Sequence, residues 1–356
     1  MKAVCGKKEG GFRFREVQAI FIFSALTDMS RYIIMKSSYY NLKNTGSPMN
    51  YTQQILKEVK KAVSGKDQAM VWILMTILAG GHVLLEDMPG VGKTTAALAF
   101  SRALGLSYGR VQFTPDVLPS DVTGFSLYQK ETGRMIFQPG AVLCNFFLAD
   151  ELNRATSRTQ SALLEAMEEG QVTVDGNTYR LPAPFFVMAT QNPTGAAGTQ
   201  LLPDSQMDRF TVRLSLGYPD PASELEMVKN RLSGNPLDAV RAVVNADGVT
   251  DMQREVQSVY IKDELLEYLI SLVNATRNHG LILRGASPRA TLSLTAMAKA
   301  AAYMRGRDFV VPQDILTVYP RVVEHRLLLA PEAQTQGEGA ASILKQIAAR
   351  VPAPKV

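Results

Sequence analysis

A glycine-rich turn between residues 87 and 95 contains the residues best suited to chemistry, among them Gly92-Lys93-Thr94. The apolar run Val83 to Leu85 before it predicts a short buried strand, and Thr94 to Leu104 after it predicts a helix. The backbone N–H groups of Gly90 to Thr94 can then point into one concavity at the positive end of that helix. Such a concavity suits a polyphosphate, because it offers an anion several donors and a helix dipole.

Lys93 and Thr94 are the side chains that a nucleoside triphosphate requires at such a turn. Lys93 would reach the β- and γ-phosphates, and the Thr94 hydroxyl would take one position around a Mg²⁺ ion. One position departs from the usual pattern Gly-x-x-x-x-Gly-Lys-Ser/Thr, because Asp87 stands where the first glycine belongs. Taken alone, the stretch therefore also fits an ordinary strand-to-helix turn that contains Gly-Lys.

Two adjacent carboxylates, Asp150 and Glu151, follow the apolar run Val142 to Ala149. A buried parallel strand over that run would place both acids at the carboxyl edge of a sheet, where ligands of α/β proteins bind. Asp150 would hold Mg²⁺ through its water shell, and Glu151 would polarise an attacking water. The alternative is a pair of acids at a helix N-terminus. The acids follow Lys93 with one strand unit between them, however, and this spacing favours the metal site.

Asn192 follows the next apolar strand, predicted over Pro184 to Thr190, and brings another polar group to the same edge. It also fits a turn asparagine before Pro193. Two arginines, Arg209 and Arg289, lie near predicted helix starts. On their own they fit solvated positions or surface ion pairs.

Strands and helices alternate through residue 215, which predicts a parallel α/β sheet. Two hairpins are predicted near residues 125–138 and 171–181, the second around the turn signal Asp175-Gly176. Strand signals stop beyond residue 218, and helical patterns replace them. The helices predicted there are Ser223–Leu232, Lys262–Asn278, Pro288–Met304 and Pro312–Leu329.

The composition shift near residue 218 predicts a boundary between an α/β core, residues 49–218, and a helical domain, residues 219–330. A basic N-terminal extension, residues 1–48, and a C-terminal tail, residues 331–356, flank these domains. The extension is predicted to be poorly ordered, or an over-long start before Met49. A membrane-surface arm is the alternative, because aromatic side chains alternate there with cations.

Charge is distributed unevenly along the 356 residues, whose formal net charge is +5. Residues 1–48 carry eight Lys and Arg against three Asp and Glu, so the remaining residues are neutral overall. A neutral body lacks the basic excess of a nucleic-acid motor, which argues against nucleic acid as a partner.

The remaining composition predicts a cytoplasmic protein. Cys144 lies in an apolar run, which favours a buried free thiol over a disulfide with Cys5. The three histidines show no metal-site spacing, and no apolar run reaches the length of a membrane span. An integral membrane segment is therefore not expected.

The order of these motifs resembles that of the MoxR family of AAA+ ATPases, over about Met49 to Leu329. In this family the phosphate loop has the pattern Glu-Asp-x-Pro-Gly-x-Gly-Lys-Thr, so Asp87 fits the family's pattern. The resemblance implies an α/β fold of the P-loop NTPase (AAA+) type, with a parallel sheet core, two β-hairpin insertions and a following all-α lid domain. The stretches most specific to the family are Phe113 to Gly124, Ala149 to Ala155, Gln160 to Glu169, Ala189 to Pro193 and Gly285 to Ala290.

The resemblance assigns roles to the residues of the predicted site. Lys93 and Thr94 match the Walker A motif, and Asp150 and Glu151 match the Walker B motif. Asn192 matches sensor 1, which helps to position the water. Mg²⁺ would therefore be held by Thr94 and Asp150.

The resemblance also reaches residues that the motifs alone leave open. Arg209 matches the arginine finger, which reaches the nucleotide of a neighbouring subunit, and Arg289 matches sensor 2, which reports the nucleotide state from the lid. Val63 and Gly65 match the segment that contacts adenine, although Lys66 replaces the usual Gln. The residues expected to bind ATP are Val63, Gly65, Pro89, Gly90, Val91, Gly92, Lys93, Thr94 and Thr95.

The function that the resemblance implies is ATP hydrolysis by a homo-oligomeric ring, with a hexamer expected by analogy with the family. Such rings act as chaperones on a protein client, in the assembly, maturation or metal insertion of protein complexes. A protein with a von Willebrand factor A domain is the implied partner. Two alternatives stay open: a motor stimulated by nucleic acid, and a nucleotide-dependent scaffold that hardly hydrolyses.

Overall fold

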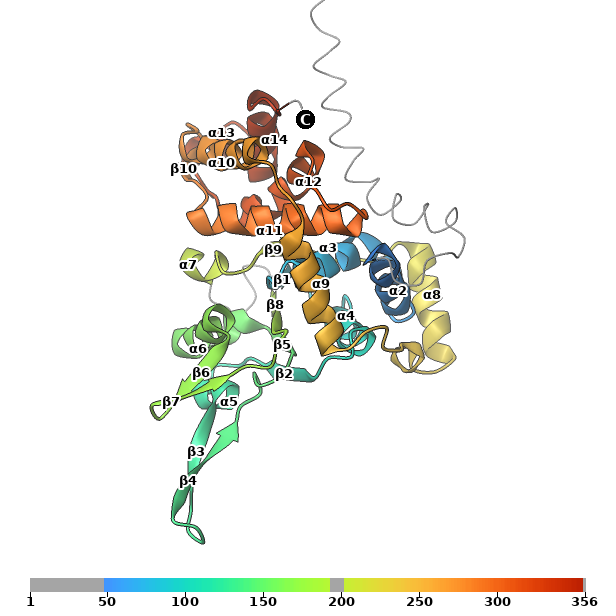
Figure 1. Ribbon diagram of the computed structural model, residues 1–356, viewed down its shortest axis with the longest axis vertical. Helices are drawn as coiled ribbons and strands as arrows, with labels where there is room; N and C mark the ends of the chain where they lie inside the picture. The colour runs from blue at the N-terminus through green and yellow to red at the C-terminus, as the bar shows by residue number, and fades with distance from the viewer. Residues whose placement is uncertain (1–47, 193–201, 355–356) are drawn as a thin grey trace, which may run out of the picture.

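A five-stranded sheet with the strand order β2-β5-β8-β1-β9 forms the centre of the molecule (Figure 1). Our computed structural model describes residues 48–192 and 202–354, so the predictions for residues 1–47 lie outside it. Neighbouring strands all run parallel, which confirms the predicted sheet. The strands are β1 (Val83–Glu86), β2 (Tyr108–Gln112), β5 (Phe146–Asp150), β8 (Phe186–Gln191) and β9 (Val212–Leu214).

Strands β5 and β8 are buried along their whole length, as strands covered on both faces must be. β5 begins at Phe146, later than the apolar run from Val142 predicted, because Asn145 makes other contacts. Asn145 Oδ1 accepts a hydrogen bond from the Ser107 hydroxyl (2.8 Å), and its Nδ2 donates to the Pro184 carbonyl (3.0 Å). Asn145 therefore ties together the amino ends of β2, β5 and β8.

Two hydrophobic clusters cover the two faces of the sheet, since Val83 and Leu85 belong to one cluster and Leu84 to the other. This is the alternation expected of side chains along a strand. The first cluster includes side chains of α2 (Pro48–Lys60), α3 (Asp67–Leu78) and α4 (Lys93–Ala103), and the second includes those of α5 (Pro119–Thr123) and α6 (Ser157–Glu169).

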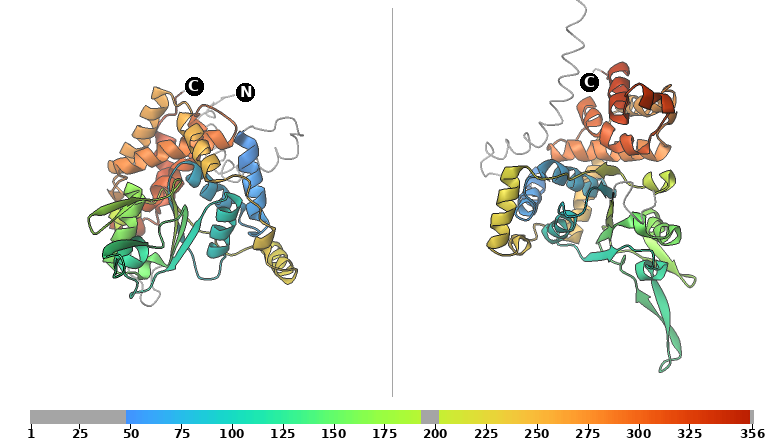
Figure 2. Two further views of the ribbon diagram at one scale, coloured as in Figure 1. Left: turned by 60° about the horizontal axis from the view of Figure 1, so that its bottom comes forward. Right: turned by 180° about the vertical axis from the view of Figure 1, so that it is seen from behind.

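Both predicted hairpins are present as antiparallel pairs outside the central sheet. The pair β3 (Gly124–Gln129) and β4 (Arg134–Pro139) extends far from the body of the molecule (Figure 1, and Figure 2, right). The pair β6 (Gln171–Val174) and β7 (Asn177–Arg180) lies nearer the sheet. Its turn residues Asp175 and Gly176 both have positive φ angles, 49° and 79°, as a type I′ turn requires.

Helices dominate the chain beyond β9. The tail contributes to this helical part, because α14 (Ala340–Arg350) buries Ile343, Leu344 and Ile347 and contacts α10 and α12. Across residues 48–192 and 202–354 we find no helix long and apolar enough to cross a membrane. The other helices are α7 (Asp204–Met207), α8 (Pro221–Leu232), α9 (Ala246–Ser258), α10 (Asp263–Arg277), α11 (Pro288–Met304), α12 (Pro312–Val323) and α13 (Pro331–Thr335), with 3₁₀ turns at Leu152–Arg154, Pro236–Ala239 and Glu324–Arg326.

The helix predicted over Pro312–Leu329 is too long, because α12 ends at Val323. A 3₁₀ turn follows, and β11 (Leu328–Leu329) then pairs antiparallel with β10 (Ile282–Arg284). The early end has a physical reason. It lets the buried side chains of His325 and Arg326 turn toward residues 208–211, where both bond to backbone carbonyls.

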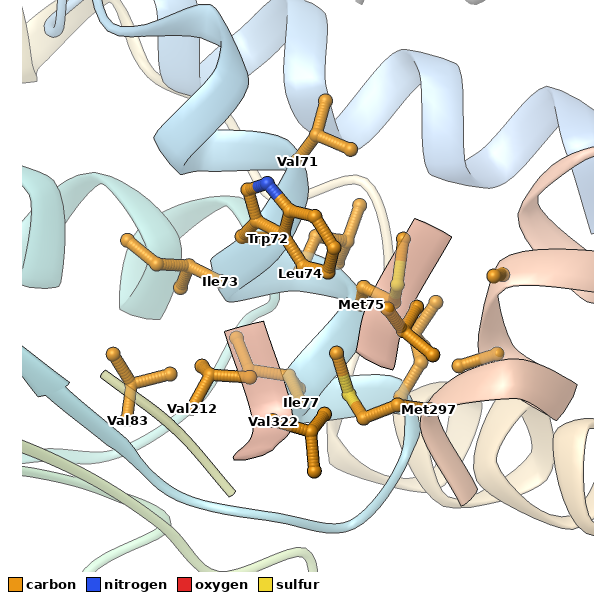
Figure 3. Packing of buried hydrophobic residues seen from close by; sticks show 14 of the residues in the cluster. Val71, Trp72, Ile73, Leu74, Met75, Ile77, Val83, Val212, Met297 and Val322 are labelled. Atoms are coloured by element: carbon orange, nitrogen blue, oxygen red, sulfur yellow. The ribbon is translucent and has the colours of Figure 1, made fainter. Parts of the chain in front are cut away.

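The α/β core and the helical domain share one hydrophobic cluster. Figure 3 shows Trp72 and Met75 of α3 packed near Met297 of α11 and Val322 of α12. Helix α3 also contacts α9 and α11 directly. The division of the chain at residues 218 and 330 stays a prediction, but these parts are packed on each other.

His82 provides a pH-dependent contribution to stability. Its ring is buried, its Nδ1 accepts from the Val187 N–H (3.1 Å), and its Nε2 lies 3.2 Å from the Met167 carbonyl. Burial lowers the pKa of His82 from 6.5 to about 4. The folded state therefore favours the neutral ring, and protonation favours the unfolded state.

We expect the stabilisation from the neutral His82 ring to be complete above pH 6.5 and to be lost as the pH falls toward 4. The loss amounts to roughly 3 kcal/mol of unfolding free energy. Urea unfolding of wild type and His82→Gln at several pH values measures it, since the stability difference between the two should shrink in acid. His279→Gln is the control, and a His82→Gln difference that does not change with pH contradicts the prediction.

Candidate functional site

The loop between β1 and α4 has the shape of an anion cradle. Gly90 and Gly92 have φ angles of +86° and +96°, and Gly92 caps the start of α4. Apart from the glycine itself and its chain neighbours, no atom of the described residues lies within 4 Å of the place where a Cβ would stand on either glycine. The space above the loop is therefore open to a ligand at the positive end of α4. Pro89, Val91 and Thr95 belong to the same turn and first helical turn.

Lys93 is buried at the base of this loop, with only 7% of its surface exposed. Its Nζ donates a hydrogen bond to the Asp87 carbonyl (2.8 Å). Burial lowers the pKa of Lys93, whereas the nearby charges of Asp150, Asp87 and Glu151 raise it. The ammonium group therefore lies between the phosphate loop and the acidic pair, where a phosphate can replace the carbonyl as its partner.

The carboxylate of Asp87 explains why this chain has no glycine at the first position of the motif. It accepts hydrogen bonds from the Ser215 hydroxyl (2.6 Å), the Leu216 N–H (2.6 Å) and the Gly217 N–H (3.0 Å). The phosphate loop is thereby tied to the segment that follows β9. Lys66 joins the same contact, because its Nζ donates to the Gly217 carbonyl (2.7 Å).

A cavity of about 530 Å³ lies beside this segment, and Val63 and Gly65 are among the residues that line it. That these two residues contact adenine stays a prediction. Its volume is that of a typical small-molecule pocket. Gly65 has a φ of +72°, and a Cβ on it would come within 2.4 Å of the Ser223 hydroxyl. Lys66, which stands where the family usually has Gln, does not line this cavity. The substitution therefore changes a residue beside the cavity and not one that lines it.

The acidic pair lies at the end of β5, as the sequence predicts. Asp150 Oδ1 accepts from the Thr190 hydroxyl (2.7 Å), and Oδ2 accepts from Nη2 of Arg110 (2.7 Å). Thr190 Oγ1 also accepts from the Glu151 N–H (2.8 Å). Thr190 therefore orients both acids from β8, and nothing in its apolar sequence context singled it out.

The Glu151 carboxylate is held from two sides. Its Oε1 accepts from Asn192 Nδ2 (3.2 Å), and its Oε2 accepts from Arg154 Nη1 (3.0 Å). Glu151 has a φ of +57°, a strained value for a side chain with a Cβ, of the kind found at functional sites. Asn192 Oδ1 is buried, and among the described residues it has no hydrogen-bond partner, so it can accept from a water beside Glu151.

The oxygen donors at this edge fit Mg²⁺. The described residues hold no group of three or more His, Cys, Asp or Glu side chains that could enclose a metal alone. Magnesium in nucleotide sites instead takes one or two protein oxygens together with phosphates and waters. The Thr94 hydroxyl at the start of α4 and the Asp150 carboxylate are such a pair, since both adjoin Lys93.

The structure does not bring Arg209 and Arg289 to this edge. Both guanidinium groups pair instead with Glu168 at the end of α6, Arg209 at 3.2 Å. The end of α6 lies beside the start of β1, because the Met167 carbonyl meets the ring of His82. The phosphate loop begins five residues after His82, about 16 Å away along a strand. The two arginines therefore lie near the amino edge of the sheet.

A second polar network, missed by the sequence analysis, fixes the backbone around Arg209. Arg326 is buried; its Nε donates to Asp208 Oδ1 (2.8 Å) and its Nη2 donates to the Phe210 carbonyl (2.7 Å). The Ser287 hydroxyl, which caps α11, also donates to Asp208 Oδ2 (2.8 Å). A buried arginine more than a hundred residues from its partners leaves no local pattern in the sequence.

Fold and site together define an AAA-type ATPase, because a parallel sheet carries a phosphate loop and an acidic pair at one edge and is followed by a helical lid. Residues 82–212 match the ATPase family associated with various cellular activities (AAA), and residues 274–347 match the AAA lid domain. The lid match extends into α14, as far as residue 347. A crystal structure of a candidate ATPase from Cytophaga hutchinsonii is 39% identical with a TM-score of 0.80, covering 86% of this chain and 96% of that one.

Two relatives identify the family within the AAA-type ATPases. The uncharacterized protein YeaC of Bacillus subtilis is 44% identical over 299 residues, which are 84% of this chain and 93% of that protein. Chaperone MoxR1 of Mycobacterium tuberculosis is 37% identical over 313 residues, which are 85% of this chain and 82% of that protein. The chain belongs to the MoxR family of AAA+ ATPases.

Replacing Asp87 with Ala tests whether its carboxylate fixes the phosphate loop. Three donors lose their acceptor, so we expect the free energy of unfolding to fall by roughly 2–4 kcal/mol. Nucleotide affinity should fall as well, because the loop is no longer tied to residues 215–217. Urea unfolding and a nucleotide titration measure the two effects.

Ser215→Ala is the matched control, because it removes one of the three donors and leaves the carboxylate in place. It should cost less stability than Asp87→Ala. An Asp87→Ala protein with wild-type stability and affinity contradicts the assigned role.

Proposed function

We propose that this protein hydrolyses ATP as a ring of identical subunits, in which each nucleotide site is completed by the next copy. The observation that carries the proposal is the separation of two groups of residues. Lys93, Asp150, Glu151 and Asn192 lie at the carboxyl edge of the sheet, and Arg209 lies with Arg289 near the other edge. Arginines that far from their own phosphate loop would reach only a neighbour's nucleotide.

Within one site, the chain's own residues would perform three tasks. Lys93 and the loop N–H groups would bind the phosphates, and Mg²⁺ held by Thr94 and Asp150 would neutralise charge on their oxygens. Glu151 would take a proton from the attacking water, and Asn192 Oδ1 would orient that water. The interactions of Glu151 with Arg154 and Asn192 support this role, because they aim its carboxylate.

The arginines of the neighbouring subunit would stabilise the negative charge that develops during phosphoryl transfer. Arg209 would act as the finger, and the pairing of Arg209 and Arg289 with one carboxylate supports the proposal that Arg289 acts on the same neighbouring site. Hydrolysis would then depend on assembly. A hexamer is the ring size we propose, from the family resemblance.

The biological role we propose is that of a cytoplasmic chaperone in the assembly, maturation or metal insertion of protein complexes. The name of the relative Chaperone MoxR1 supports the chaperone role. A partner with a von Willebrand factor A domain and a protein client are proposed from the family resemblance. The neutral charge of residues 49–356 speaks against the nucleic-acid motor, and the intact acidic pair speaks against a scaffold without hydrolysis.

Two variants separate binding from hydrolysis. Lys93→Ala should weaken nucleotide binding, because the phosphates lose their buried cation. Glu151→Gln should retain nucleotide affinity and lose turnover by about a hundredfold or more, the typical contribution of a general base. Equilibrium binding of a fluorescent nucleotide and steady-state phosphate release measure the two properties. Wild-type turnover in Glu151→Gln would remove Glu151 from the mechanism.

Mixing two inactive variants tests whether the site is shared between copies. Glu151→Gln subunits retain the arginines, and Arg209→Ala subunits retain the acidic pair. If Arg209 acts on a neighbour, an equal mixture should recover up to about a quarter of wild-type turnover, because random assembly in a ring places a competent donor beside an intact site at that frequency.

Phosphate release from the mixture, compared with that from each variant alone, gives the result. If Arg209 acts within its own subunit, no site in the mixture is complete. Turnover that stays at the level of the separate variants therefore contradicts the shared site.

A further inference from the structure

Glu168 joins the two arginines that the proposed function places at the subunit contact. Its Oε2 lies 3.2 Å from Nη2 of Arg209, and its Oε1 accepts a hydrogen bond from Nη2 of Arg289. Glu168 belongs to α6 of the α/β core, and Arg289 belongs to α11 of the lid. One carboxylate therefore connects the two arginines across the contact between core and lid.

The backbones of the two arginines are already fixed relative to each other. Ser287, two residues before Arg289, donates its hydroxyl to Asp208, which directly precedes Arg209. Arg326 bonds to the same carboxylate (2.8 Å). These contacts fix the backbones and leave the directions of the two long arginine side chains undetermined. Glu168 is the group that both guanidinium groups contact.

The contact with Glu168 is too exposed to serve mainly as a source of stability. The side chains of Arg209, Arg289 and Glu168 are 30%, 38% and 39% exposed. Ion pairs of this kind typically stabilise a fold by about 0–1 kcal/mol. Without Glu168, two like charges would share one place without a counter-ion, and each guanidinium group would turn toward solvent.

The neighbouring acids on α6 do not share this arrangement. Glu165, Glu168 and Glu169 all line a hollow of about 420 Å³ that also contains Arg209. Within the described ranges, neither Glu165 nor Glu169 forms an ion pair. Arg209 Nε is buried and has no hydrogen-bond partner among the described residues.

We propose that Glu168 is a positioning residue that gathers Arg209 and Arg289 into one receptor for the phosphates of the neighbouring subunit's ATP. This proposal rests on the proposed function, because it concerns arginines that act in the next copy. Glu168 neutralises one of the two positive charges and holds both planar forks at one place. Two guanidinium groups that are already in position need to reorganise less when the phosphoryl group acquires charge.

The mixture of Glu151→Gln and Arg209→Ala subunits provides the test, because each copy in it can contribute only one half of a complete site. Glu151→Gln copies donate the arginines, and Arg209→Ala copies hold the ATP that is hydrolysed. Glu168→Gln is placed first in the donor copies and then in the copies that hold the ATP. The readouts are kcat and KM of the mixture, with assembly followed by light scattering.

In donor copies, Glu168→Gln should lower kcat by roughly tenfold or more, because misplaced catalytic groups lose large factors in rate. KM for ATP should change little, since the ATP-binding loop belongs to the other copy. In the copies that hold the ATP, the same substitution should cause a much smaller loss. Glu168→Asp in donor copies should recover part of the rate, and Glu165→Gln in donor copies should leave it unchanged.

Three results would overturn the role of Glu168: equal losses from both placements, no loss in donor copies, or a faster rate in donor copies. Equal losses would mean that Glu168 supports the fold. A faster rate would mean that it restrains the arginines. A starting mixture with Glu168 intact that shows no recovery is a different failure, because it refutes the shared site and therefore the proposed function.

Discussion

The buried carboxylate of Asp87 is the interaction on which the nucleotide site depends. A carboxylate removed from water requires hydrogen-bond donors, and Asp87 finds three of them in residues 215–217. Gly217 also accepts a hydrogen bond from Lys66 through its carbonyl, next to residues 63–65, which line the cavity of about 530 Å³. Gly217 therefore connects the phosphate loop, through its N–H, with the residues beside that cavity, through its carbonyl.

The direction of the strands imposes the second constraint. All five run parallel, so every residue that follows a strand lies at one edge, and every residue that precedes one lies at the other. Asp150 ends β5 and Asn192 follows β8, whereas Arg209 precedes β9. The sheet therefore separates Arg209 from the acidic pair of its own copy. In the ring that we propose, a second copy would supply the arginine to that pair.

The same polarity explains how much of the site could be predicted. Apolar runs that end in Asp150-Glu151 and in Asn192 are readable from the sequence, because strand direction alone brings their ends together. The interactions of Glu168, Thr190 and Arg326 were missed, because each depends on side chains from different elements. The end of α12 at Val323 was missed for the same reason, since it is set by the contacts of Arg326 with residues 208–211 and not by local helix preference.

The continuous hydrophobic cluster between α3, α11 and α12 has a consequence for motion. A hinge that lifted the lid would expose side chains such as Trp72, Met75 and Met297, at a cost of about 25 cal/mol for each Å² of apolar surface. Closely packed interiors rearrange between discrete states and do not deform gradually. We therefore expect core and lid of one copy to move together, so that in the proposed ring a cycle of nucleotide binding and release would mainly rotate whole subunits against each other.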